Sequence, residues 1–215
     1  FLGISWWFLL WNAIMNVMMA SDVVILGLMN SVESVTNYSL TKYVPETLIS
    51  IIAIIIFGIA PGLGGIIGSG DKQRASVIRG EIMALTWLLL IALGSSLVIW
   101  NNAFLSLWVG QGHYSGYIPN LLIILVVLQF IFIRNDSNFI DLTLQLKWKV
   151  ILGAIATIVS LGTAAILVGY FNLGVIGICL GTIFGRSLLS FSYPLMVGKY
   201  LDFPWYLQLK RILRP

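Results

Sequence analysis

The chain has 215 residues, of which 59% are hydrophobic and only 9% are charged. Soluble domains carry roughly a quarter charged residues, so this chain has too few charges to cover a globule with a hydrated surface. The composition excludes a soluble enzyme, a nucleic-acid-binding domain and a disordered linker, and it predicts a polytopic membrane protein. With one cysteine (Cys179) and one histidine (His113), the chain can form neither an internal disulfide framework nor a multi-cysteine or multi-histidine metal site.

Six apolar stretches are long enough to cross the hydrocarbon core, which takes about 20 helical residues. They lack the strand-like alternation of a membrane barrel, so we predict helices, which satisfy their backbone hydrogen bonds internally. The predicted fold class is therefore all-α, with one domain (1–201) that forms a six-helix transmembrane bundle. In chain order the predicted spans are 4–28, 44–67, 78–99, 118–140, 150–170 and 175–197.

The connections between the predicted spans differ in charge. Connections 101–116 and 171–174 carry no charged residue, and the connection after the first span holds only Glu33 and Lys42. Because basic residues concentrate in cytoplasmic loops, we expect a multi-pass protein of the cell (inner) membrane with both ends of this chain in the cytoplasm. The basic residues of the other connections and of the tail are Lys72, Arg74, Arg79, Lys147, Lys149, Lys199, Lys210, Arg211 and Arg214.

The last segment, 202–215, is basic and amphipathic. Asp202 is placed to cap a short helix with one apolar and one basic face, so we predict an interfacial helix that lies on anionic headgroups. A frayed end without structure is the alternative. The chain begins with Phe1 and stops inside this basic sequence, so we expect it to belong to a longer transporter with further helices.

Arg186 is the most informative charge, because it lies near the middle of the last predicted span. An arginine at that depth costs about 2.5–3.5 kcal/mol on insertion scales. Thr182, Arg186 and Ser190 are spaced four residues apart and share one helical face. We predict that this face lines an aqueous cavity and binds substrate. The alternative is a structural arginine bound to backbone carbonyls or to a partner acid.

Glycine residues predict two further features of the helices. In the last span a stripe offset from Arg186 by about 100° predicts a close-packing surface. In the second span Pro61 lies among several glycines and predicts a kink, either a hinge of a transporter or a static packing feature. The stripe consists of Gly177, Gly181 and Gly185, and the glycines around Pro61 are Gly58, Gly62, Gly64 and Gly65.

A second polar stripe ends the fourth span. Arg134, Asn138, Asp141 and Gln145 share one helical face, and Arg134 and Asp141 are close enough for a common polar network. We take Arg134 and Asn138 as candidate substrate contacts and Asp141 as a candidate ion-coupling acid. An arginine that merely reaches the headgroups is the alternative.

Two charged residues near the outer ends of the first two spans complete the candidate set. Asp22 lies in the outer third of the first span, where it is either a proton-exchanging carboxylate, a solvated acid or a packing contact. Lys42 begins a row with Glu46 and Ser50 at the mouth of the second span. The row is either a substrate contact or a wet helix end.

Several short segments resemble the second helical bundle of the polysaccharide flippases, which are O-antigen and teichoic-acid exporters related to the multidrug-and-toxin extruders. The segments are SDVVILG at 21–27 with VTNYS at 35–39, FLSLWVG at 104–110, NLGVIGI at 172–178 with Gly181 and Thr182, Tyr193-Pro194, and the basic tail. In order and spacing they cover nearly the whole chain.

The resemblance implies a transporter rather than an enzyme, with about 12 to 14 spans in two bundles. It would move an undecaprenyl-diphosphate-linked oligosaccharide to the outer leaflet by alternating access, with no cofactor or metal. Its partners would be this cargo, membrane lipids and the N-terminal bundle of the same protein, with no nucleic acid. A cation-coupled multidrug antiporter of the same superfamily and a polytopic prenyl-phosphate transferase are the alternatives.

The charge and depth of the candidate residues suggest their roles in such a transporter. Arg186 would bind the diphosphate at mid-depth through paired donors, with Thr182 and Ser190 on the same face. Arg134 and Asn138 toward the inside and Lys42 toward the outside would receive and release the cargo. The ion-coupling candidates are Asp22 and Asp141.

Overall fold

The computed structural model describes residues 2–202, and within that range every regular element is a helix. The predicted all-α class is confirmed for this part of the chain. The helices are α1 (Leu2–Met29), α2 (Val32–Gly68), α3 (Lys72–Trp108), α4 (Tyr117–Leu142), α5 (Leu146–Gly169) and α6 (Gly174–Tyr200). The interfacial helix predicted for 202–215 lies outside the described residues except for Asp202, whose carboxylate pairs with the Lys72 ammonium at 2.6 Å.

Among the described residues, five helical segments are long and apolar enough to cross a membrane, so the protein is a multi-pass membrane protein. They are Ser5–Met29 within α1 and the whole of α3, α4, α5 and α6. Within α2 the described residues include a shorter apolar stretch, Gly58–Gly68. The count of six membrane spans therefore stays a prediction.

Helices α2 and α3 begin or end well beyond the predicted spans, because local caps extend them. The Ser31 hydroxyl accepts a hydrogen bond from the Ser34 N–H at 3.2 Å and starts α2 at Val32. The Asp71 carboxylate accepts from the Arg74 N–H at 3.0 Å and starts α3 at Lys72. Each helix has 37 residues and is about 55 Å long, more than a bilayer core requires. Lys42, expected in a loop, is therefore a helical residue.

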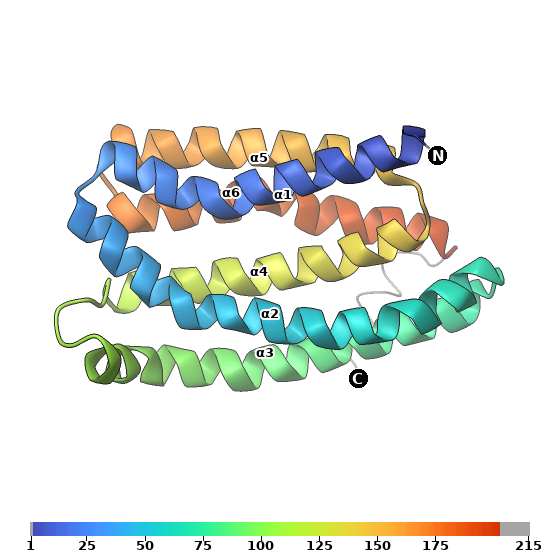
Figure 1. The fold of residues 1–215 in the computed structure, drawn as a ribbon, viewed down its shortest axis with the longest axis horizontal. Coiled ribbons are helices and arrows are strands. Elements are labelled where there is room, and N and C mark those ends of the chain that lie inside the picture. Colours follow the sequence, from blue (N-terminus) through green and yellow to red (C-terminus); the bar gives the residue numbers. More distant parts are fainter. Residues whose placement is uncertain (1, 203–215) are drawn as a thin grey trace.

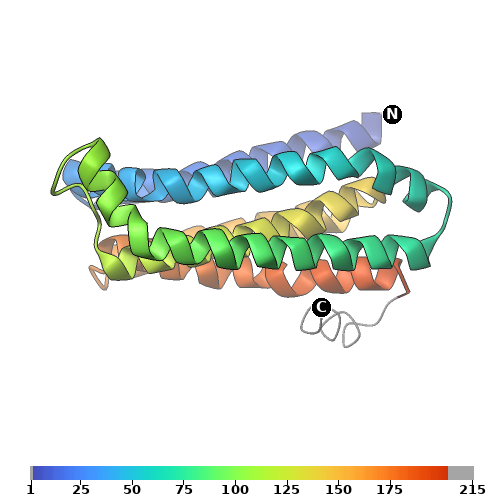
Figure 2. The ribbon, with the colours of Figure 1, turned by 90° about the horizontal axis from the view of Figure 1, so that it is seen from below.

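The helices run alongside one another in two groups (Figure 1). Helices α1, α5 and α6 form one group and α2, α3 and α4 the other, and the contact of α4 with α6 joins them. The connections 30–31, 109–116 and 170–173 gather at one end, which we call the low-charge end. The connections 69–71 and 143–145 gather at the other end, which we call the basic end because Lys72, Arg74 and Lys147 follow them in the first turns of α3 and α5 (Figures 1 and 2). From their shared turn at the low-charge end, α1 and α2 diverge toward the basic end (Figure 1).

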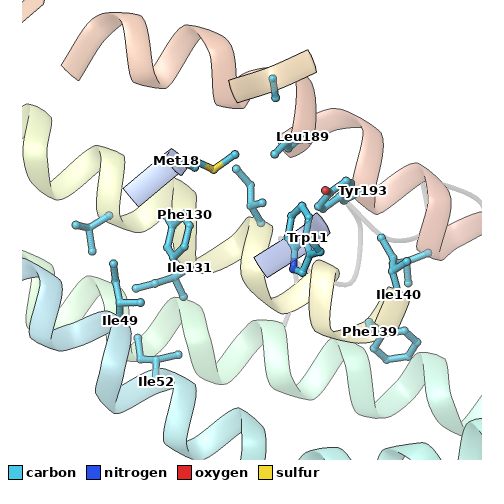
Figure 3. Close-up of a cluster of buried hydrophobic side chains, with 14 of the residues drawn as sticks. Trp11, Met18, Ile49, Ile52, Phe130, Ile131, Phe139, Ile140, Leu189 and Tyr193 are labelled. Atoms are coloured by element: carbon cyan, nitrogen blue, oxygen red, sulfur yellow. The ribbon is translucent and has the colours of Figure 1, made fainter. Parts of the chain in front are cut away.

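A buried cluster holds the two groups together between α1, α4 and α6 (Figure 3). The Trp11 and Tyr193 rings lie 6.3 Å apart, and Phe130 and Leu189 are almost fully buried beside them. Trp11 packs directly on the backbone of α5, where a Cβ at Gly153 would lie only 2.6 Å from its ring. Aromatic side chains of this size bury large apolar areas, so the cluster fixes α1 against its neighbours.

The glycine stripe of α6 is the surface that packs on α5, as the sequence predicts. A Cβ on Gly181 would lie 2.5 Å from the Ala164 Cα, and one on Gly185 would lie 2.5 Å from the Ser160 Cβ. Gly177 is nearly as close to α5. The α5–α6 contact is the most extensive in the fold, because small residues let the two backbones approach.

Helix α2 continues through both of its prolines. Pro45 has no N–H, so the Thr41 carbonyl has no helical donor, and the Asn101 side-chain amide of α3 donates to that carbonyl at 2.9 Å. Asn101 also donates to the Asn120 amide oxygen of α4 at 2.7 Å. Pro61 does not end α2, and the hinge at that position stays a prediction.

Candidate functional site

Asp22 and Lys42 form a buried ion pair between α1 and α2. Both residues are 8% exposed. One carboxylate oxygen of Asp22 accepts from the Lys42 ammonium at 2.7 Å and from the Tyr38 hydroxyl at 2.5 Å. The other accepts from the Val23 N–H at 2.8 Å. The solvated-acid and wet-helix-end alternatives for these two residues are therefore wrong.

Glu46 connects this ion pair to the surface. Its carboxylate accepts from the Lys42 ammonium at 2.8 Å, and its side chain is 36% exposed. One ammonium thus serves two carboxylates, one buried and one half-exposed, and it also lies 5.4 Å from the centre of the Tyr38 ring. The Lys42 ammonium therefore partly balances the negative charges of Asp22 on α1 and of Glu46 on its own helix.

Arg186 of α6 contacts α1 near the Asp22–Lys42 ion pair. Its guanidinium donates to the Met18 carbonyl of α1 at 2.8 Å and lies 5.2 Å from the Phe130 ring centre. The residue is only 4% exposed, and its Nε has no hydrogen-bond partner among the described residues. Met18 lies one turn before Asp22 on α1, which places this guanidinium near the ion pair. We call Asp22, Tyr38, Lys42, Glu46 and Arg186 the outer network, after the side on which the charge pattern predicts it. Figure 3 shows Met18 and Phe130, two neighbours of Arg186, within the buried apolar cluster.

The predicted neighbours of Arg186 on α6 have separate surroundings. Thr182 is buried. The Ser190 hydroxyl donates to the Arg186 carbonyl at 3.3 Å and accepts from the Gln129 amide at 3.2 Å. Gln129 of α4 also donates to the Ile183 carbonyl at 3.1 Å. Gln129 is not among the predicted site residues, although an amide within an apolar span is itself a signal of a contact between helices.

Asp141 pairs with Lys149 toward the basic end. The ammonium of Lys149, which is fully buried, donates to the Asp141 carboxylate at 2.5 Å and lies 4.1 Å from the Trp11 ring centre. The Tyr193 hydroxyl donates to the Lys149 carbonyl at 2.9 Å. Lys149 was assigned to a cytoplasmic connection, and that assignment is wrong because α5 begins earlier, at Leu146. Arg134 is half-buried on α4.

A third buried ion pair was missed altogether. Nε and Nη2 of Arg79, on α3, donate to one carboxylate oxygen of Asp136, on α4, at 2.9 and 2.6 Å. Both residues are buried, whereas sequence analysis placed Arg79 in a loop. Asn138 lies beside this pair, in a cavity of about 20 Å³ that Arg79 and Asn135 also line. The signal was present in the sequence, since Arg79 continues the helical spacing of Ala75 and the buried α3 face.

The predicted site residues therefore fall into two groups at different depths. Asp22, Lys42 and Arg186 meet in the outer network, whereas Asn138 and Asp141 lie toward the basic end beside other ion pairs. Each of the three pairs joins two neighbouring helices, and together they place several charges inside an apolar fold, where charges are costly and mark functional sites. The aqueous cavity predicted beside Arg186 stays a prediction.

Comparisons of the chain with protein-family models, with curated proteins and with solved structures found no match.

Proposed function

We propose that the chain is one six-helix bundle of a two-bundle membrane exporter that moves a lipid-linked oligosaccharide across the bilayer by ion-coupled alternating access. The cargo would be an undecaprenyl-diphosphate-linked oligosaccharide, and the protein would act in the inner membrane with the basic end in the cytoplasm. The observation that carries the proposal is the outer network. Two cations, Arg186 and Lys42, lie with a buried acid where three helices meet, inside a predominantly apolar fold.

The chemistry of the cargo fits this cluster. A diphosphate is anionic, and guanidinium and ammonium groups bind phosphate oxygens with short, charge-assisted hydrogen bonds. Within the part of the chain that the structure describes, one buried N–H of Arg186 is unpaired, and this donor could bind a ligand. Thr182 and Ser190 would add hydroxyl contacts on the same helix, and Arg134 and Asn138 would contact the cargo toward the basic end.

Ion coupling would act through the acids that hold the helices together. Asp22 ties α1 to α2 through Lys42, and Asp141 ties α4 to α5 through Lys149. Protonation of either carboxylate would weaken one helix–helix tie and so favour a different arrangement of the bundle. Alternating access would then come from movement of this bundle against its partner bundle.

The test is complementation in cells that lack their own flippase. Lipid-linked oligosaccharide on the inner leaflet is measured with the wild-type protein, with Arg186→Gln and with Lys147→Gln at matched protein levels. Lys147 is an exposed lysine of the basic end, so its variant loses the same unit of charge outside the site. We expect clearance by wild type and Lys147→Gln and accumulation with Arg186→Gln. Clearance by all three would remove Arg186 from the mechanism, and accumulation with wild type would contradict the proposed cargo.

A second candidate function is cation-coupled drug antiport, which the burial of Asp22 favours. Asp22 is held by two donors from α2, a position suited to a coupling acid between two moving helices. In that case Asp22→Asn would abolish efflux of cationic dyes from cells, whereas Arg186→Gln would leave it largely intact. The reverse pattern, or no efflux with wild type, would exclude this candidate.

A further inference from the structure

We propose that the outer network is a binding site for a phosphate-group anion, and that the carboxylate of Asp22 occupies it as an internal substitute for that anion. The site itself follows from the contacts of Asp22. Only the identity of its natural ligand, the diphosphate of a lipid-linked sugar, rests on the proposed function.

The groups around Asp22 are the groups that bind an oxyanion. The Lys42 ammonium and the Tyr38 hydroxyl donate to the same carboxylate oxygen at 2.7 and 2.5 Å. Arg186 adds a second positive charge nearby, because its guanidinium donates to the carbonyl of Met18, one helical turn before Asp22 on α1. The ammonium and the hydroxyl, both from α2, converge on one carboxylate oxygen, and the guanidinium comes from α6. Such a set of donors suits the several acceptor oxygens of a phosphate as well as it suits a carboxylate.

One cationic donor near this site has no partner among residues 2–202. Arg186 is only 4% exposed, yet its Nε makes no hydrogen bond within that range. An unsatisfied buried N–H of a charged group costs free energy, so a buried arginine normally has its donors filled. A phosphate has more acceptor positions than the one carboxylate present, and a larger oxyanion could accept from this nitrogen as well.

Glu46 gives the site a connection to the surface. It accepts from Lys42 at 2.8 Å and is the half-exposed member of the network. When a phosphate group binds, the Lys42 ammonium can release the Asp22 carboxylate and bind the phosphate instead. Its contact with Glu46 would remain. The exchange would loosen the tie between α1 and α2, which diverge from their turn beside this site (Figure 1). Binding of the anion and separation of these two helices would therefore be coupled.

The test is rescue of a vacated site. Wild type, Asp22→Ala and Asp136→Ala are placed in phosphatidylcholine nanodiscs, and their melting temperatures are measured in potassium chloride and in potassium phosphate of equal ionic strength. Asp136 is a matched control because it is also a buried carboxylate with a cationic partner. We expect phosphate to raise the melting temperature of Asp22→Ala by about 3 °C or more, to raise that of the wild type by less because the anion must first displace Asp22, and to leave Asp136→Ala within about 1 °C.

Two further variants keep the outcome decisive. Asp22→Ser also removes the carboxylate and leaves space for an anion, so it carries the same expectation and serves if Asp22→Ala does not fold. Adding Lys42→Met to the Asp22 variant should abolish the rescue. No rise with either Asp22 variant, or an equal rise in all proteins, would overturn the proposal. Rescue by formate but not by phosphate would also overturn it, because the site would then accept only the missing carboxylate.

The source of the phosphate group is distinguished by changing the lipid. Nanodiscs that contain phosphatidylglycerol, without added phosphate, test whether a lipid phosphodiester reaches the site, and the inorganic phosphate arm tests a soluble anion. Stabilisation of the Asp22 variant in either arm supports the site and identifies its source. All of these readouts are melting temperatures and need no transport, so a failed complementation assay would leave the anion site standing, and a failed rescue would leave transport open.

Discussion

Lys149 and Asp141 are an ion pair whose two members differ sharply in exposure. The Lys149 side chain is fully buried, whereas 23% of the Asp141 side chain is exposed. A charge left without its partner costs most where water cannot reach it. The two halves of this pair should therefore respond differently to mutation, even though they make the same contact.

We expect Asp141→Ala to destabilise the protein by about 3–5 kcal/mol, because the Lys149 ammonium then keeps only the Trp11 ring as a neighbour in the contacts described. Lys149→Met should cost about 2 kcal/mol less, because the remaining carboxylate can hydrate. The free energies of unfolding of both variants, measured by detergent titration, test this order. Equal losses would show that solvent reaches both charges alike.

The Thr41 carbonyl shows how a proline in one helix recruits a side chain from another. Its helical donor is absent because of Pro45, and Asn101 supplies the hydrogen bond at 2.9 Å. Asn101→Leu should therefore cost about 1–3 kcal/mol in the native background. In a Pro45→Ala background the alanine N–H can satisfy Thr41, so the same Asn101→Leu change should cost about 1 kcal/mol less.

A double-mutant cycle of unfolding free energies measures this difference. Pro45→Ala alone provides the control, since it adds a donor to a carbonyl that already has one. If the cost of Asn101→Leu is the same in both backgrounds, the Thr41 carbonyl is not what Asn101 stabilises, and its bond to Asn120 would then carry the effect.

The sequence shows which charged residues lie within apolar helices, where burial costs free energy. It shows less readily which residues form ion pairs with them. Arg186 is visible because counting places it mid-span. Lys42, Arg79 and Lys149 lie near the ends of apolar stretches, where hydropathy favours a loop. Their partners are on other helices, as Asp136 of α4 is for Arg79, and a single-chain pattern does not contain that pairing. Burial of these residues is a tertiary effect that only the packed helices reveal.

At the scale of elements, the α5–α6 contact is the feature that periodicity predicts best. Glycine every fourth residue on α6 gives a flat stripe, and α5 packs on it with backbone atoms against backbone atoms. The glycine stripe predicts close packing without knowledge of the neighbouring helix, because only small residues allow two helix backbones to come so close. The start of α2 is the opposite case: the Ser31 cap extends the helix through polar sequence in which hydropathy shows no span.

We expect Gly181→Ala to destabilise the protein by about 2–4 kcal/mol, because the new methyl group would overlap the backbone of Ala164 and push the helices apart. Gly162→Ala is the matched control: it is an exposed glycine of α5 whose Cβ would meet nothing within 4 Å. That variant should be neutral or up to about 1 kcal/mol more stable, because alanine favours a helix over glycine.

Melting temperatures of the two glycine variants, measured in the same lipid, decide the point. A Gly181→Ala protein as stable as Gly162→Ala would mean that α5 and α6 are farther apart in the membrane than in the fold described here. Gly185→Ala, which faces Ser160, should behave like Gly181→Ala.

At the scale of the whole molecule, the two ends differ in charge as the sequence alone indicates. The structure brings the connections 69–71 and 143–145 to one end, where Lys72, Arg74 and Lys147 begin the following helices, and brings the connections without charged residues to the other end (Figure 2). This segregation follows from helices that alternate in direction with short connections. Which end faces the cytoplasm is a separate matter, since it depends on the charge bias of the loops and the insertion machinery.

The orientation prediction can be tested with two cysteines introduced at matched residues. Gln111 lies in the connection 109–116 at the low-charge end, Gln73 lies in the first turn of α3 at the basic end, and both are exposed. In a Cys179→Ala background, a membrane-impermeant maleimide added to intact cells should label Gln111→Cys and should label Gln73→Cys only after permeabilisation. Labelling of both in permeabilised cells shows that each thiol is reactive, so the intact-cell result reports sidedness. The opposite labelling pattern would reverse the orientation. Arg134, Asn138 and the Asp141–Lys149 pair would then lie toward the outside. The outer network would lie toward the cytoplasm, the side from which an anionic cargo enters.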